Sequence, residues 1–171
     1  GIVYTGDFKF DQTAAKGYKT DFARLAENGQ SGVLALMSDS ANAENTENTK
    51  QIADEHEISN FISSNFEYHN GRIIVACKAS NILRVQEILN AAAANDRKVF
   101  LTGRDAEKIV QTAIDLKKLR LPEKDILVPL SQLDKYKDDQ IVILETGRSG
   151  EPLKSLQKMA LHRHRTINLH K

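Results

Sequence analysis

The residues best suited to chemistry form a glycine-containing turn directly after an apolar run at positions 141–144. The turn consists of Thr146, Gly147, Arg148, Ser149 and Gly150. Its two glycines allow a tight turn and a close approach to a ligand, and Pro152 suits the first turn of a helix. A strand, a glycine turn and a helix N-terminus together offer free N–H groups to an anion, and Arg148 adds a forked donor that matches phosphate. A plain strand-to-helix turn with a surface arginine is the alternative.

Two aspartates also follow strand-like runs. Asp7 lies in the segment 6–11, and its carboxylate could bind a metal, orient a catalytic group or cap a turn. Asp39 lies in the segment 37–42, at the end of a strand where ligands of α/β sheets usually bind. It could hold a metal or orient a histidine, and an Asx-type cap on the following loop is the alternative.

The histidines near the end of the chain are a weaker candidate for a metal site. His162 and His164 form an H-x-H pair, and His170 lies six residues further on. A metal site needs more ligands, and no second pair is evident. We therefore favour a solvated basic segment here, and we interpret the single cysteine, Cys77, as a buried apolar side chain.

Short apolar runs must position these residues. The strands that we expect are 33–37, 72–77, 98–101, 126–128, 140–144 and the closing run 166–169, together with an opening run at 1–6. Most of these runs are continuous rather than alternating, which is typical of strands buried on both faces. Helical periodicity predicts helices over 48–67, from Ser80 or Asn81 onward, over 106–116 and after Pro152. The alternation of strands and helices predicts an α/β fold with a parallel sheet covered by helices. The segments 38–50 and 117–139 are polar and irregular, apart from the short strand in the second.

Composition narrows the function less than the motifs do. With 24 Lys and Arg against 23 Asp and Glu, the net charge is +1, so a nucleic-acid site would have to be a local patch. No long apolar span or signal peptide is evident, so we expect no membrane partner and a cytoplasmic location. A stand-alone nucleotide-binding module is the alternative function, and the glycine turn is its only support. The turn matches neither G-x-G-x-x-G nor the P-loop pattern, which counts against this alternative.

Taken together, the chain resembles the ribonuclease J family, metallo-β-lactamase-fold ribonucleases that carry a β-CASP insertion. The resemblance covers nearly the whole chain in order, in the stretches 4–11, 21–26, 36–44, 71–76, 80–82, 146–147 and 151–152. It implies a parallel, Rossmann-like sheet flanked by helices. It also implies that 1–30 is a remnant of the metallo-β-lactamase half, 31–160 the β-CASP domain and 161–171 a return strand. Because the chain opens and closes in strand-like runs, we expect a piece of a longer protein.

The resemblance also implies roles for single residues. Asp7 matches the aspartate that bridges two metal ions, and Asp39 matches the acidic residue that orients a catalytic histidine. Residues 146–150 match the loop that holds the RNA backbone, and Ser80 and Arg84 match a helix start that faces the same channel. The cofactor would be zinc, manganese or magnesium in the full-length enzyme. None is expected in this chain, because the remaining ligands would lie elsewhere.

This chain departs from the family's catalytic pattern in the glycine turn. Catalytic members usually read Thr-Gly-Ser-Gln-Gly-Glu-Pro, whereas Arg148 and Ser149 occupy the variable positions here. Together with Glu145 before the turn, this is similar to the second ribonuclease J paralogue of Gram-positive bacteria, generally the weaker nuclease. The resemblance therefore implies RNA, a paralogous ribonuclease J subunit and other RNA-degradation proteins as partners. We expect this chain to bind RNA without cutting it.

Overall fold

The computed structural model describes residues 1–11, 13, 19–41, 43–44, 54–103, 105–146, 152–167 and 169. The chain divides into two compact units, residues 1–60 and 61–171, and each is described by itself. No helix in the described part of the chain is long and apolar enough to cross a membrane.

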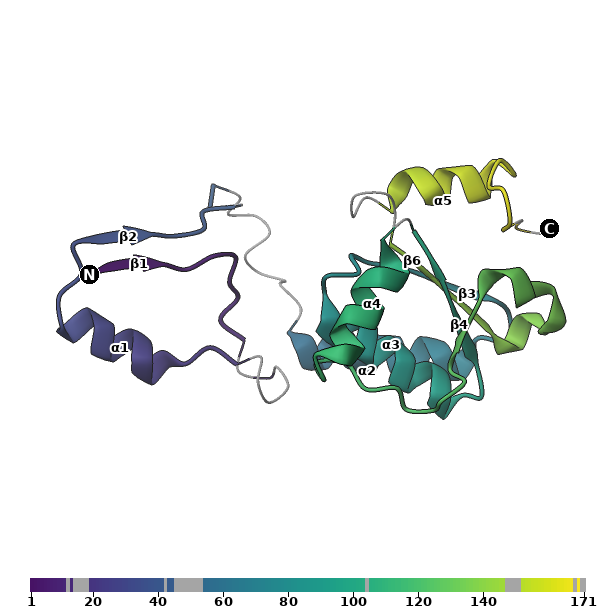
Figure 1. Cartoon of the computed structure of the whole chain (residues 1–171), viewed down its shortest axis with the longest axis horizontal. Helices are drawn as coiled ribbons and strands as arrows, with labels where there is room; N and C mark the ends of the chain where they lie inside the picture. Colours follow the sequence, from purple (N-terminus) through teal and green to yellow (C-terminus); the bar gives the residue numbers. More distant parts are fainter. Residues whose placement is uncertain are drawn as a thin grey trace. The chain divides into compact units, whose positions relative to one another are not determined.

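The first unit contains two parallel strands and a helix between them (Figure 1). Strand β1 (Ile2–Tyr4) pairs with β2 (Ala35–Met37), so that Ile2 lies beside Ala35 and Tyr4 beside Met37. Helix α1 (Phe22–Gln30) begins at Asp21, whose side chain accepts a hydrogen bond from the N–H of Arg24. None of the residues of α1 is buried, and both strands expose large apolar side chains. A two-stranded sheet of this kind is marginal without further surfaces to cover it.

The second unit is built on a four-stranded parallel sheet with the order β3-β6-β4-β5. Its strands and helices, in chain order, are β3 (Ile73–Ala76), α3 (Ile82–Ala94), β4 (Lys98–Thr102), α4 (Ala106–Asp115), β5 (Leu127–Val128), β6 (Ile141–Glu145) and α5 (Leu153–Ala160). Helix α2 (Glu55–Tyr68) precedes them, and the division between the two units falls within it. The parallel α/β sheet expected from the sequence is therefore confirmed.

Strand β6 lies between β3 and β4 and is buried in the apolar core. All five residues of β6 are buried, as expected for a strand with neighbours on both edges and cover on both faces. Ile141 and Ile143 face a cluster with Phe100, Met159 and Ile167, on the side of α5. Because side chains alternate along a strand, Val142 and Leu144 face the opposite side, which α3 and α4 cover (Figure 1).

Several sequence expectations differ from the structure. The expected strand at 166–169 is not formed by its described residues; instead Ile167 is fully buried in the cluster on the α5 side of the sheet. The segment 117–139 contains β5 as predicted, but it also contains a 3-10 helix (Leu130–Lys135) and the start of a second one (Asp138–Gln140). Helix α1 was not expected at all. The helix expected over 48–67 begins at Glu55, and positions 48–53 lie outside the described residues.

Buried Arg97, just before β4, holds the turn that precedes β3 in place. Its guanidinium donates hydrogen bonds to the carbonyls of Gly71, at 2.8 Å, and of His69. Its side chain therefore satisfies two carbonyls in the turn before β3, and only 4% of the residue is exposed.

Candidate functional site

The carboxyl ends of three parallel strands form one edge of the second unit. Strands β3, β6 and β4 end at Ala76, Glu145 and Thr102, which lie in register with one another. Helices α3, α4 and α5 begin a few residues later, so their N-termini follow this edge. Helix N-termini carry unpaired N–H groups and the positive end of the helix dipole, and they favour anions. We call this set of strand ends and helix starts the carboxyl edge.

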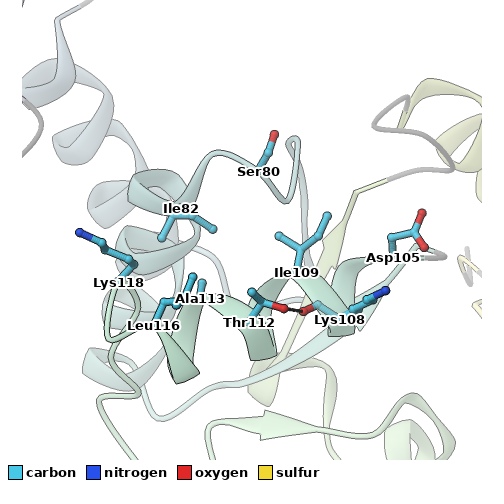
Figure 2. Close-up of a pocket in the computed structure, with 9 residues that line it drawn as sticks. All are labelled: Ser80, Ile82, Asp105, Lys108, Ile109, Thr112, Ala113, Leu116 and Lys118. Atoms are coloured by element: carbon cyan, nitrogen blue, oxygen red, sulfur yellow. Dashed lines mark hydrogen bonds between the residues drawn. The ribbon is translucent and has the colours of Figure 1, made fainter.

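Ser80 lies at this edge, exposed, one residue before the cap of α3. The cap is Asn81, whose side chain accepts a hydrogen bond from the N–H of Arg84 at 3.1 Å. Ser80 also lines a groove of about 620 Å³ between the start of α3 and the length of α4 (Figure 2). Lys108, in the first turn of α4, lies at the same groove, and Lys118 lies beyond the other end of the helix.

Arg84 is held inside the protein rather than extended toward solvent. Its guanidinium forms an ion pair with Glu87, one turn further along α3, and only 11% of its side chain is exposed. A contact between Arg84 and a phosphate would therefore have to be shared with the Glu87 carboxylate. The predicted role of Arg84 stays a prediction.

Thr146, the first residue of the glycine turn, is buried and fixed to β4. Its N–H and its hydroxyl both donate to the carbonyl of Thr102, at 3.0 and 3.1 Å. The hydroxyl is therefore part of the scaffold, and a role for Thr146 in binding would be indirect. Gly147, Arg148, Ser149 and Gly150 lie outside the described residues.

In the first unit, Asp7 and Asp39 each follow the last residue of a strand of the small parallel sheet, at the same end of that sheet. Strands β1 and β2 are parallel, and the ladder continues from the N–H of Thr5 to the carbonyl of Met37 at 3.0 Å. The Thr5 hydroxyl accepts a hydrogen bond from the N–H of Asp39 at 3.2 Å and donates to the carbonyl of Gly6 at 2.7 Å. Gly6 has a φ of 60°, which favours glycine, and the chain turns there to expose Asp7.

The Oδ1 of Asp39 accepts a hydrogen bond from the N–H of Ala41 at 2.9 Å. This is the hydrogen bond expected if Asp39 is an Asx-type cap on the following loop. Within the described ranges, no three His, Cys, Asp or Glu side chains come together to hold a metal ion. The described residues thus do not by themselves form a metal site, and the role of Asp7 stays a prediction. His164 uses its Nδ1 to accept from the N–H of Ile167 at 3.0 Å, and His170 lies outside the described residues.

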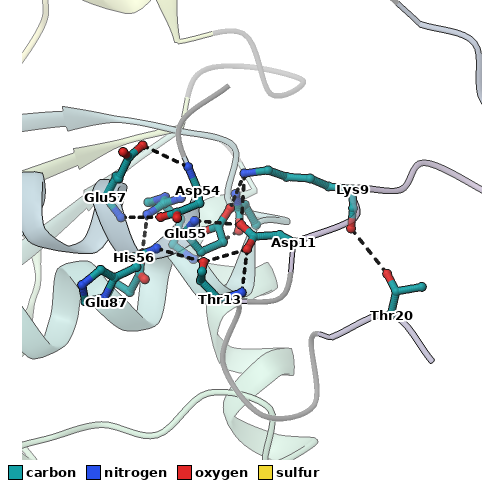
Figure 3. Close-up of polar contacts among 11 residues, drawn as sticks. Lys9, Asp11, Thr13, Thr20, Asp54, Glu55, His56, Glu57 and Glu87 are labelled. Atoms are coloured by element: carbon teal, nitrogen blue, oxygen red, sulfur yellow. Dashed lines mark hydrogen bonds and ion pairs between the residues drawn. The ribbon is translucent and has the colours of Figure 1, made fainter. Parts of the chain in front are cut away.

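Cys77 is half-buried rather than fully buried as expected, because it follows β3, an edge strand of the sheet. Burial raises the pKa of its thiol. Asp11 has a structural role that sequence reasoning missed. Asp11 is 93% buried by area, since 7% of it is exposed, and it accepts hydrogen bonds from the hydroxyl of Thr13 at 2.6 Å and from the N–H of Glu55 at 2.8 Å (Figure 3). It therefore caps helix α2 from 44 residues away in the chain.

The protonation of Asp11 should affect stability in acid. The hydroxyl of Thr13, together with the N–H of Glu55, holds the pKa of the Asp11 carboxyl well below its usual range. The ionised form therefore stabilises the fold above the ordinary aspartate pKa of about 3.9, and this contribution is lost as the pH falls toward the lowered value. We expect D11N to have a lower Tm than the unsubstituted chain at pH 7, and the difference should shrink below about pH 4.

Thermal unfolding between pH 7 and pH 2.5 measures this difference. D7N, which removes the same charge at an exposed position of the same unit, is the matched control and should change the Tm little. A D11N variant with an unchanged Tm at pH 7 would contradict the capping role.

The fold and the residues at its edges define the class of this protein. A parallel α/β sheet flanked by helices is the architecture of a β-CASP domain of the metallo-β-lactamase family, and the family model described as "Ribonuclease J, beta-CASP domain" matches residues 70–171. The chain is 50% identical to Ribonuclease J 2 of Streptococcus pyogenes serotype M3 over 168 residues, which are 98% of this chain and 30% of that protein. It is 40% identical to Ribonuclease J 2 of Staphylococcus aureus over 169 residues, which are 98% of this chain and 29% of that protein.

The chain therefore belongs to the ribonuclease J family, and it spans about 30% of the length of these relatives. The resemblance seen in the sequence, including that to the second paralogue, is confirmed.

Proposed function

We propose that this chain is the RNA-binding β-CASP portion of a metal-dependent ribonuclease, an exo- or endonuclease of RNA decay and processing. By itself it binds RNA and does not cut it. The observation that carries this proposal is the carboxyl edge of the second unit, where three helices begin beside the ends of β3, β4 and β6. Ser80 and Lys108 supply side-chain donors there, and the turn with Arg148 follows β6.

The helix N-termini and the side-chain donors favour phosphate as the group that binds at this edge, where Asp105 and Glu107 at the start of α4 act against it. A phosphodiester is an anion with several acceptor oxygens, and it suits helix N-termini, a hydroxyl and a lysine at the same time. None of the described residues that line the groove between α3 and α4 is aromatic, so these residues offer no platform on which bases could stack. Binding should therefore depend on the RNA backbone more than on its sequence.

We propose that Asp7 supplies one ligand to a divalent metal ion, and that Asp39 orients a catalytic group, in a protein of the relatives' full length. Zinc, manganese or magnesium held there would activate water for attack on a phosphodiester. The division into 1–30, 31–160 and 161–171 belongs to the same proposal. So do the partners that the resemblance implies, a paralogous ribonuclease J subunit and other RNA-degradation proteins.

Two lysines of the same groove test the RNA-binding proposal. Lys108 lies at the carboxyl edge, whereas Lys118 lies beyond the far end of α4, a helix about 15 Å long at its ordinary rise. We expect K108A to weaken the affinity for a single-stranded oligoribonucleotide about twofold to fivefold at low salt, as the loss of one phosphate contact does. K118A removes the same charge from the same groove and should leave the affinity within about twofold.

Fluorescence anisotropy with a labelled oligouridylate measures both affinities under the same conditions. Equal losses in the two variants would show that the net charge, not the carboxyl edge, attracts the RNA. No loss in either variant would remove Lys108 from the proposed surface.

A further inference from the structure

The segment from Pro152 onward carries a concentrated positive charge that the proposed binding surface does not use. Residues 152–171 contain five of the chain's 24 Lys and Arg, three of its five His and none of its 23 Asp and Glu. The rest of the chain therefore holds 19 Lys and Arg against 23 Asp and Glu, a net charge of −4. A local patch of cations, in a chain whose total charge is only +1, is what a site for a polyanion requires.

Four of these cations lie in the described residues, and all four are exposed: Lys154, Lys158, Arg163 and Arg165. None of the four forms an ion pair with another described residue. By contrast, Lys98 in the same unit pairs with Glu123 at 3.1 Å and with Asp125 at 2.8 Å. The described part of the chain thus leaves the four charges to an outside ligand, and we call the four residues the α5 cation surface.

Helix α5 and the turn after it hold these side chains in place on one face of the sheet of the second unit (Figure 1). Lys154 and Lys158 lie one turn apart along the helix. The N–H groups of Arg163 and His164 both donate to the carbonyl of Lys158, at 2.7 and 3.0 Å, so the chain folds back onto the last turn of α5. The Nδ1 of His164 then accepts a hydrogen bond from the N–H of Ile167, which is fully buried. The cations are therefore presented by a fixed backbone.

Exposed cations in a segment without acidic residues suit a chain of phosphates better than a protein surface. Lysine is depleted in protein–protein interfaces relative to the rest of the surface. Lys and Arg are common donors to the phosphates of nucleic acids, and such contacts do not depend on the base sequence. Helix α5 begins at the carboxyl edge and is eight residues long, or about 12 Å at its ordinary rise. An RNA strand held at that edge therefore meets these cations by following the helix.

We propose that the α5 cation surface is a second contact for the backbone of single-stranded RNA, which continues from the carboxyl edge along α5. The surface adds affinity without reading the base sequence. The inference rests on the proposed function, because it assumes that RNA is bound at the carboxyl edge.

The test is the removal of two charges from exposed positions of α5. K154Q/K158Q keeps two long, uncharged side chains, and we expect it to bind oligouridylate about fourfold to twentyfold more weakly at low salt, as the loss of two phosphate contacts does. The slope of log affinity against log salt should become less negative by about 1.4, since each phosphate contact to a single strand contributes about 0.7.

The matched control is K117Q/K118Q, which changes the net charge equally. Both lysines are exposed and follow α4, which covers the opposite face of the sheet from α5 (Figure 1). This control should leave the affinity within about twofold and the slope unchanged. R163Q/R165Q replaces K154Q/K158Q should that variant not fold, as checked by circular dichroism, and the same losses are expected of it.

Two comparisons separate the inference from the proposal beneath it. If K108A weakens RNA binding but the α5 variant binds like the control, the inference alone is wrong. If the unsubstituted chain does not bind oligouridylate, the proposed function fails and the inference fails with it. An oligoglutamate of equal charge is the competitor that represents an acidic protein partner, and it should not displace the RNA at equal concentration. Displacement by the oligoglutamate would assign the surface to a protein and would overturn the inference.

Discussion

In a protein of the relatives' full length that contains this chain, D7N is expected to lower the rate of RNA cleavage at least about a hundredfold. Mutation of a residue that only supports a metal ligand often lowers metal affinity or activity tenfold to a hundredfold. Mutation of a ligand itself should lower the cleavage rate by no less. Asp7 is suited to this role because it is exposed directly after β1, at the same sheet edge as Asp39. Cleavage rates with saturating RNA, measured together with the metal content of the purified protein, check the prediction.

The same substitution should have no effect on cleavage by the chain of 171 residues. We expect no cleavage by this chain with or without a chelator, because one carboxylate cannot replace a site that needs three or more protein ligands. D134N, an exposed aspartate of the second unit, is the control in both proteins. Cleavage by the short chain that is abolished by chelator and also by D7N would overturn this part of the account.

I167A is expected to lower the free energy of unfolding by about 2–5 kcal/mol, the usual loss when a fully buried isoleucine is truncated to alanine. The residue is completely buried and packs in the cluster that contains Phe100, Ile143 and Met159. For a unit of this size such a loss corresponds to a decrease in Tm of about 10 °C or more.

The matched control for I167A is L161A, which removes an apolar side chain of similar size from a position that is 60% exposed. L161A should change the stability by less than about 0.5 kcal/mol. Thermal and urea unfolding monitored by circular dichroism compare the two variants. If the two variants lose equal stability, or neither does, Ile167 does not anchor the end of the chain on the sheet.

The central strands could be predicted from the sequence because they are continuous apolar runs. β6 is buried along its whole length, and its run of Ile, Val, Ile and Leu shows this directly. The edge elements and the chain end could not be predicted as well. Helix α1 has nine residues and buries none of them, and the Asp21 cap marks its start. The apolar residues near Ile167 fit a strand equally well, and only packing against the sheet decides between the two.

The sequence could predict at which strand ends the candidate site residues lie. It predicted less well which partners their side chains and those of neighbouring residues bind. Asp7 and Asp39 share a sheet edge because parallel strands end together, which the order of elements already indicates. By contrast, Asp11 caps a helix 44 residues away, which depends on tertiary geometry that no local pattern encodes. Arg84 forms an ion pair with Glu87, three residues further along the same helix, and the helical spacing of the two residues could have indicated this pair.

The salt dependence of RNA binding by this chain tests the central claim most directly. If phosphates are bound at the carboxyl edge, a plot of log affinity against log salt falls with a slope of about −0.7 for each phosphate contact to a single strand. K108A should make that slope less negative by about 0.7, and K118A should leave it unchanged. A flat plot for the unsubstituted chain, or RNA binding with the same slope in K108A, would contradict the account.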